Sequence, residues 1–151
     1  MIQPRRSVRI VFVGRHNDTR TQIAEGFARR RFDPAELSFR SAGTSPSRLS
    51  PWAVQVMDEV GIDISGQSAT ALEAILASNV DKVVLLEPDL KLPARFYGVR
   101  RVEWRVADPS ASALSAGAML RQFRAARDQI EPLVLALGQR LASASARLNL
   151  Q

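Results

Sequence analysis

Three observations predict a single α/β domain in which four parallel strands form a sheet between layers of helices. The chain has 151 residues, the usual size of one domain. Short apolar runs rich in β-branched residues alternate along it with segments whose apolar residues recur at helical spacing. Neither an internal repeat nor a linker interrupts this alternation, so we expect one domain over residues 1–151.

The first strand is expected at Val8–Val13, a short run of β-branched and apolar residues. A polar loop follows from Gly14, after which apolar residues recur at helical spacing. Asp18 or Thr19 is a suitable N-cap, and the basic residues 29–31 suit the negative end of the helix dipole. This part of the chain therefore predicts a strand, a polar loop and a helix.

The next segment predicts a second strand and two helices. Leu37–Ser41 alternates apolar and polar residues as a strand does, and turn-forming residues close it. Pro51, with Ser50 as a cap, opens a helix that Gly61 should end. Ala69–Leu76 is expected to form another short helix.

The remainder predicts two more strands and a long final helix. Lys82–Leu86 is the third strand and Arg101–Val106 the fourth. Apolar residues over 116–141 are spaced as in one long helix, which Pro132 should bend or split. Residues 142–151 are rich in Ser and Ala, and we expect this tail to fray. Because strands alternate with helices, the strands should run parallel and helices should cover both faces of the sheet, giving three layers.

Composition excludes several kinds of chemistry. The chain contains no cysteine, which excludes disulfides, thiolate metal sites and a thiol nucleophile. His16 is the only histidine, so neither a histidine-based metal site nor a Ser-His-Asp triad is expected, and no cofactor is indicated. No apolar run is long enough to span a bilayer and no signal peptide is found, so the expected location is the cytoplasm.

The net charge of +6 at pH 7 comes almost wholly from arginine and permits anionic partners. The arginines are scattered, and few aromatic residues lie among them for base stacking. A solvated helical surface is therefore a better interpretation of the charge than a nucleic-acid site, which ranks last among the alternatives. The oligomeric state is left open.

Three polar loops should meet at the carboxyl end of the sheet, where ligands bind in open parallel sheets. They are Gly14–Thr21, Ser41–Pro46 and Ala107–Ser110. The first loop runs directly into a helix N-terminus, where free backbone N–H groups and the helix dipole favour an anion. Arg20 can add a bidentate fork to an oxyanion. These features predict a phosphate-like anion as the ligand, such as phosphate, sulfate or arsenate.

Residues 11–25, Val-Phe-Val-Gly-Arg-His-Asn-Asp-Thr-Arg-Thr-Gln-Ile-Ala-Glu, resemble the phosphate-binding loop and first helix of low-molecular-weight tyrosine phosphatases. Thioredoxin-linked arsenate reductases share that fold. The family pattern is a cysteine, five residues, an arginine and a hydroxyl residue, and Arg20 and Thr21 occupy the last two positions. Further segments are similar in order and spacing: Ser41–Thr44, Ala53–Ser65 and Trp104–Pro109. The resemblance implies the family's Rossmann-like α/β/α fold over roughly residues 8–140.

The resemblance also implies a site, in which Gly14 stands where the family has its catalytic cysteine. Asp108 stands at the position of the general acid, and Asn17 and Ser41 are expected to support the loop. Asp18 places a carboxylate inside the loop. The residues expected to contact an oxyanion are Arg15, His16, Asn17, Asp18, Thr19, Arg20 and Thr21.

Two of these residues have a second interpretation. Arg20 is either an anion fork or one half of an ion pair with Asp18 or Asp108 that closes the pocket. His16 is either part of the site or a loop residue whose ring forms local hydrogen bonds.

Because glycine has no side chain, Gly14 cannot supply the nucleophile that attacks phosphorus or arsenic. The sequence therefore predicts a pseudoenzyme that binds a phosphate-like oxyanion, a phosphorylated ligand or a protein partner without turnover. The alternative is an active tyrosine phosphatase or arsenate reductase with a nucleophile other than cysteine, or a cysteine-substituted variant of such an enzyme. Thr19 or Thr21 would need an activating base for that role, and His16 is the candidate.

Overall fold

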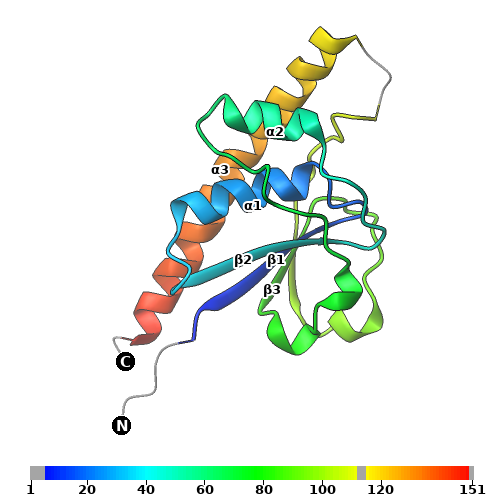
Figure 1. Ribbon diagram of the computed structural model, residues 1–151. Coiled ribbons are helices and arrows are strands. Elements are labelled where there is room, and N and C mark those ends of the chain that lie inside the picture. Colours follow the sequence, from blue (N-terminus) through cyan, green and yellow to red (C-terminus); the bar gives the residue numbers. More distant parts are fainter. Residues whose placement is uncertain (1–5, 112–114, 150–151) are drawn as a thin grey trace.

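A computed structural model of the chain describes residues 6–111 and 115–149. The protein is built around a sheet of parallel strands (Figure 1). The strands are β1 (Val8–Gly14), β2 (Leu37–Gly43), β3 (Lys82–Leu85) and β4 (Arg100–Glu103), in the spatial order β2-β1-β3-β4. Every neighbouring pair is parallel, which confirms the predicted four-stranded parallel sheet.

β1 lies between β2 and β3, and both of its faces are covered. Ile10 and Phe12 point into one hydrophobic core, and Val11 and Val13 point into the other. These four residues are at most 1% exposed. A strand buried on both faces has a continuous apolar sequence without polar alternation, which is the pattern of this segment.

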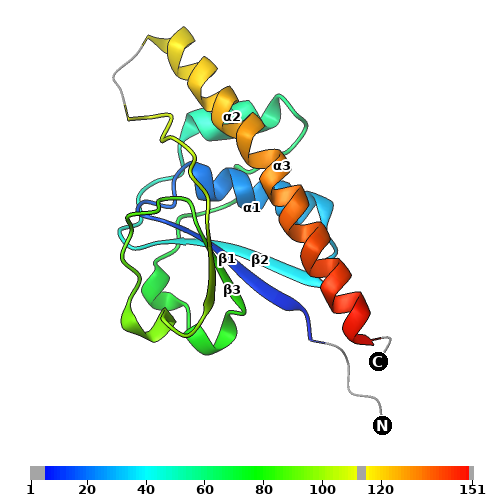
Figure 2. The ribbon, with the colours of Figure 1, turned by 180° about the vertical axis from the view of Figure 1, so that it is seen from behind.

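Three helices cover the face of the sheet that carries Ile10 and Phe12. They are α1 (Arg20–Arg31), α2 (Pro51–Asp58) and α3 (Ala116–Asn149). The long helix α3 runs past both α1 and α2, and the view from behind shows it crossing the molecule diagonally (Figure 2). Phe123 and Ile130 of α3 are fully buried in the core that these helices share with the sheet.

The other face of the sheet is covered by turns instead of α-helices. Three 3₁₀ turns lie in this layer, Leu72–Ala74, Ala77–Asn79 and Ala94–Phe96. The helix predicted over Ala69–Leu76 is wrong, because this segment first runs beside the end of β2, where Ala71 forms a bridge with Gly43. Leu72 and Ile75, three residues apart, are then buried by a turn of three residues.

α3 is longer than predicted. The expected end near residue 141 is wrong, because the helix continues to Asn149. The expected fraying of residues 142–151 is not found over residues 142–149, and residues 150 and 151 lie outside the described residues. Leu141 and Ala142 still pack against the main core, so burial holds the helix beyond the predicted end. Pro132 lies inside the helix and does not split it. Within the described residues, none of the helices has the length and apolar character that a membrane span requires.

Candidate functional site

The polar loop after β1 lies at the topological switch point of the sheet, where strand order changes direction from one side of β1 to the other. β2 is paired to one side of β1 and β3 to the other, so the loops that leave β1 and β3 stand side by side. In open parallel sheets, this crevice at the carboxyl ends of the strands is where ligands bind. The loop of residues 14–19, called the β1 loop below, therefore occupies the expected place for a site.

The β1 loop is oriented by hydrogen bonds to its carbonyl groups. A second segment, residues 44–50, donates four backbone N–H groups to it: Thr44 to Gly14 (3.2 Å), Ser45 to Arg15 (2.7 Å), Ser47 to His16 (2.9 Å) and Ser50 to Asp18 (2.9 Å). In a planar trans peptide the N–H group points away from the C=O group. The amides of residues 15, 16, 17 and 19, each of which follows one of these carbonyl groups, therefore turn to the side opposite residues 44–50.

Asn17 fixes the shape of the loop. Its backbone has a positive φ of 52°, a conformation that asparagine tolerates better than most residues. The side chain is buried and holds two segments, because its Nδ2 donates to Thr21 Oγ1 (2.8 Å) and its Oδ1 accepts from the Thr70 amide (2.8 Å). Asn17 thus joins the β1 loop to the first turn of α1 and to Thr70.

Gly43 lets β2 approach the loop closely. A Cβ at this position would come within 2.7 Å of the Arg15 carbonyl oxygen and 3.0 Å of Asn17 Cβ. The nearest atoms are backbone atoms and the Cβ of a side chain, so they cannot move without a shift of the backbone that costs free energy. Only glycine fits here without displacing the β1 loop.

Arg20 lines the crevice and has three acceptors. Its Nη1 donates to the carbonyl oxygens of Leu86 (3.0 Å) and Val106 (2.8 Å), and its Nη2 donates to Glu87 Oε1 (3.1 Å). The guanidinium is therefore held between the segments that follow β3 and β4. Its side chain is only 12% exposed.

Glu87 is a residue of this site that the sequence analysis missed. Its Oε1 accepts from the backbone N–H of Arg15 in the β1 loop (3.0 Å) as well as from Arg20. The ion pair predicted between Arg20 and Asp18 or Asp108 is wrong, because Arg20 pairs with Glu87 instead. The pairing of β1 with β3 places Glu87 at this position: Val13 pairs with Leu85, so Glu87, two residues further along, lies beside Arg15.

The remaining loop residues have local partners. His16 is exposed, and its Nδ1 lies 3.0 Å from the Ser45 carbonyl oxygen, which is a loop-internal contact. Thr19 is the N-cap residue of α1, although its side chain makes no capping hydrogen bond. Asp18 is partly buried, and within the described part of the chain its carboxylate forms no hydrogen bond or ion pair.

The two predicted residues outside the loop differ in their placement. Asp108 lines the crevice, and its Oδ1 accepts from the backbone N–H (2.9 Å) and the hydroxyl (2.7 Å) of Ser110. The Ser41 hydroxyl donates to Glu25 Oε1 on α1 (2.6 Å), so its side chain links β2 to α1 and not to the β1 loop.

The crevice is a hollow of about 420 Å³ with charges of both signs. It is lined by Arg15, His16, Arg20, Glu87, Pro88, Asp89, Leu90 and Asp108. Two arginines therefore face three carboxylates. At its base Gly14 presents no side chain, and a Cβ there would lie 3.6 Å from Glu87 Oε1 and 3.2 Å from Thr21 Cγ2.

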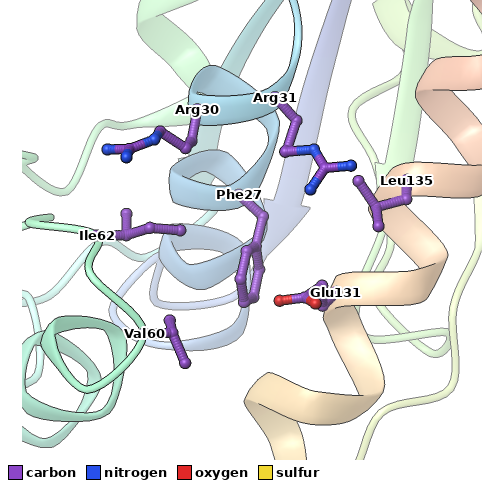
Figure 3. A pocket seen from close by; sticks show the side chains of 7 residues that line it. All are labelled: Phe27, Arg30, Arg31, Val60, Ile62, Glu131 and Leu135. Atoms are coloured by element: carbon purple, nitrogen blue, oxygen red, sulfur yellow. The ribbon is translucent and has the colours of Figure 1, made fainter.

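A second hollow, of about 220 Å³, lies between three parts of the chain: α1, α3 and the segment that follows α2 (Figure 3). Its lining is Phe27, Arg30, Arg31, Val60, Ile62, Glu131 and Leu135. Arg30 and Arg31 stand at the C-terminal end of α1, roughly 15 Å along the helix from Arg20 at 1.5 Å per residue. This hollow is therefore separate from the crevice at the sheet.

Comparison with known proteins identifies the family. Low molecular weight phosphotyrosine protein phosphatases match residues 9–147 of this sequence. The chain belongs to this family. The glutaredoxin arsenate reductase of Synechocystis sp. is 34% identical over 83% of this chain and 92% of its own length. The arsenate reductase of Bacillus subtilis is 35% identical over 80% of this chain and 88% of its own length.

The solved structures agree with this assignment. An arsenate reductase in the phosphate binding state superposes with a TM-score of 0.77 and 32% identity, covering 89% of this chain and 98% of that chain. The predicted family and its α/β fold are thus confirmed. Within this low molecular weight phosphatase family, the present member has no cysteine anywhere in its sequence.

Proposed function

We propose that this member of the family is catalytically impaired and binds a phosphate-like oxyanion, free or on a phosphorylated partner, without turning it over. The observation that carries the proposal is that Gly14, which has no side chain, begins a loop that hydrogen bonds from residues 44–50 hold in place. Covalent transfer of a phosphoryl group needs a nucleophilic side chain at that point, and glycine has none.

The retained architecture supports anion binding. The carbonyl groups of the β1 loop are bound by residues 44–50, so its amides are left facing the crevice. The loop leads into the N-terminus of α1, where the dipole adds positive potential. Arg20 is positioned beside these groups, and its planar fork matches the geometry of an oxyanion.

The contacts in the loop give no support to a hydroxyl nucleophile. Thr21 is 3% exposed, and its hydroxyl oxygen accepts from Asn17. His16, the candidate base, lies against the Ser45 carbonyl, and among the described residues no hydrogen bond joins its ring to a hydroxyl group. A hydroxyl without an adjacent base is a weak nucleophile at neutral pH.

The test has a catalytic part and a binding part. We expect no hydrolysis of p-nitrophenyl phosphate and no reduction of arsenate above background, and no phosphorylated adduct by intact-mass spectrometry after incubation with the ester. Turnover that disappears in Arg20→Ala, or an adduct on any side chain, would contradict the proposal.

Calorimetry with phosphate, sulfate and arsenate tests the binding part. Saturable binding should be lost in Arg20→Ala and retained in Arg100→Ala. The control removes the same charge from the start of β4, at the opposite end of the sheet from the β1 loop. If no anion binds to the wild-type chain or to Glu87→Gln, the anion-binding role is wrong and a protein-partner role without an anion remains.

A further inference from the structure

Glu87 places a carboxylate against the anion-binding groups of the β1 loop. One oxygen of this side chain accepts two hydrogen bonds, from the Arg15 amide at 3.0 Å and from Arg20 Nη2 at 3.1 Å. Its other oxygen lies 3.7 Å from Arg15 Nε. A loop amide and an arginine fork are the donors that an oxyanion would use here.

The backbone on both sides of Glu87 holds the carboxylate in this position. The Leu86 amide donates to the Val13 carbonyl (3.0 Å), which continues the pairing of β3 with β1. The Leu90 amide donates to the Glu87 carbonyl (3.1 Å), closing a four-residue turn whose second residue is Pro88. A residue before proline is also restricted to extended conformations. The carboxylate is therefore presented to the loop by a rigid segment.

The other carboxylates of the crevice do not share this position. Asp108 binds Ser110 through its Oδ1. Asp89 is exposed, and in the described ranges its side chain has no hydrogen bond or ion pair. Glu87 is thus distinguished from its acidic neighbours by contact with the loop, and not by charge alone.

We infer that Glu87 is the resident anion of the β1 loop, and that an external oxyanion enters only by displacing its carboxylate. This inference rests on the proposed function, since it describes how the same site is regulated. A carboxylate on the same chain competes without the translational and rotational entropy that a free ligand loses on binding. A phosphate group can still replace it, because phosphate offers more acceptor oxygens and more charge than a carboxylate.

Displacement has a consequence for the class of ligand. A small monoanion offers no more charge than Glu87 itself and should bind poorly. A dianionic phosphate or arsenate group, particularly one on a partner that adds contacts elsewhere, should be favoured. The Glu87 carboxylate therefore favours ligands that carry more negative charge than it does, because only these displace it.

The experiment compares phosphate binding to the wild-type chain, to Glu87→Gln and to Asp89→Asn. Each variant removes one negative charge from the same crevice, but only the first removes the charge that contacts the loop. We expect the phosphate affinity of Glu87→Gln to rise about tenfold or more, the effect of releasing one charge-assisted hydrogen bond or more. The affinity of Asp89→Asn should change less than about threefold, as expected for an exposed charge.

A second readout needs no ligand. In ¹H–¹⁵N spectra of the full chain without phosphate, the Arg15 amide should shift upfield in Glu87→Gln and remain in place in Asp89→Asn. Equal gains of phosphate affinity in both variants would overturn the inference. An Arg15 amide with the same chemical shift in wild type and in Glu87→Gln would also overturn it. Wild-type affinity equal to that of Glu87→Gln would overturn it as well, while leaving the proposed function intact. Conversely, no phosphate binding to any variant, Glu87→Gln included, would contradict the proposed function and the displacement together.

Discussion

At the scale of single residues, the site is defined by one absent side chain and one unexpected carboxylate. Gly14 removes the nucleophile, and Glu87 Oε1 stands 3.6 Å from where a Cβ at position 14 would be. An anionic thiolate at position 14 would lie against that carboxylate. Like charges this close oppose each other's ionisation, so the two features are chemically linked.

The link leads to a prediction for Gly14→Cys. Alone, this variant should hydrolyse p-nitrophenyl phosphate at close to background, because Glu87 opposes formation of the thiolate and occupies Arg20. Combined with Glu87→Gln it should be at least about tenfold more active, the rate effect of about 1.4 kcal/mol. The control is Gly14→Ala with Glu87→Gln, which lacks a thiol and should stay inactive. A single variant as active as the double variant would show that Glu87 does not restrain the site.

A second prediction concerns Gly43, the glycine against which the loop packs. Gly43→Ala should lower the free energy of unfolding by about 1–3 kcal/mol, because a Cβ there meets the Arg15 carbonyl oxygen at 2.7 Å. Phosphate binding should weaken too, since the β1 loop must shift. Urea unfolding and calorimetry measure the two effects. The matched control is Gly66→Ala, where no atom lies within 4 Å of the new Cβ and the change should stay within about 0.5 kcal/mol. Similar losses in both variants would mean that close packing at Gly43 is not the cause.

Single residues also show the limit of sequence reasoning. Asn17, with its left-handed backbone, and Arg20, in the crevice, could be proposed from the sequence because they belong to a contiguous motif whose spacing is visible. Glu87 is remote in sequence and reaches the loop only through the pairing of β1 with β3. Ser41 is expected to support the loop, but its hydroxyl donates to Glu25 of α1, a carboxylate that is buried with it.

At the scale of elements, α2 and α3 are joined by an ionic cluster. Arg124 of α3 donates to both carboxylate oxygens of Glu59, and Arg127 Nη1 donates to Glu59 Oε1 (2.8 Å) and to the Val56 carbonyl (2.9 Å). Arg127 is nearly buried, so this connection is more than a surface contact. Hydrogen bonds from Arg124, followed by those from Arg127, lower the pKa of Glu59 from 4.5 to about 2.

This lowered pKa predicts how stability depends on acidity. Because the Glu59 carboxyl group stays ionised to lower pH in the folded chain than in the unfolded chain, the unfolded chain binds more protons between pH 4.5 and about 2. The contribution of Glu59 is therefore complete above pH 4.5 and is lost as pH falls toward 2. Glu59→Gln should be less stable than wild type at neutral pH and should lose less stability on acidification. Urea unfolding measured from pH 6 to roughly 2.5 tests this.

The control for Glu59 is Glu36→Gln. Glu36 is exposed, and within the described residues its side chain forms no ion pair. This variant should follow the wild-type dependence on pH. If Glu59→Gln does so as well, the cluster does not couple folding to protonation.

Helices and strands were predicted well where the local pattern of apolar residues matches their burial. They were predicted poorly where a contact with a distant part of the chain determines the backbone conformation. The first three strands and α1 follow directly from apolar runs and helical spacing, whereas β4 ends at Glu103 and not at Val106 as predicted. The segment 69–76 has the composition of a helix, yet its pairing with the end of β2 holds it extended before a 3₁₀ turn. No feature within the segment itself indicates that bridge.

At the scale of the whole molecule, the sheet separates two unlike layers. One side holds three α-helices around the larger core, and the other holds turns and loops over a smaller core. The predicted helical cover is therefore present on one face only. The β1 loop lies at the carboxyl end of the sheet, and α3 runs along the helical layer (Figure 1).

The length of α3 gives the last prediction. Leu137 is 1% exposed and Leu141 packs against the main core, whereas Ser143 and Ala144 are exposed. Ser143→Ala should therefore change the free energy of unfolding by less than about 1 kcal/mol, the usual effect of a substitution at an exposed position. Leu137→Ala should lower the free energy of unfolding by about 2–5 kcal/mol, the range for emptying one large core position. Urea unfolding of the two variants measures this. A loss in Ser143→Ala as large as that in Leu137→Ala would show that packing at Leu137 is not what holds this part of α3 against the core.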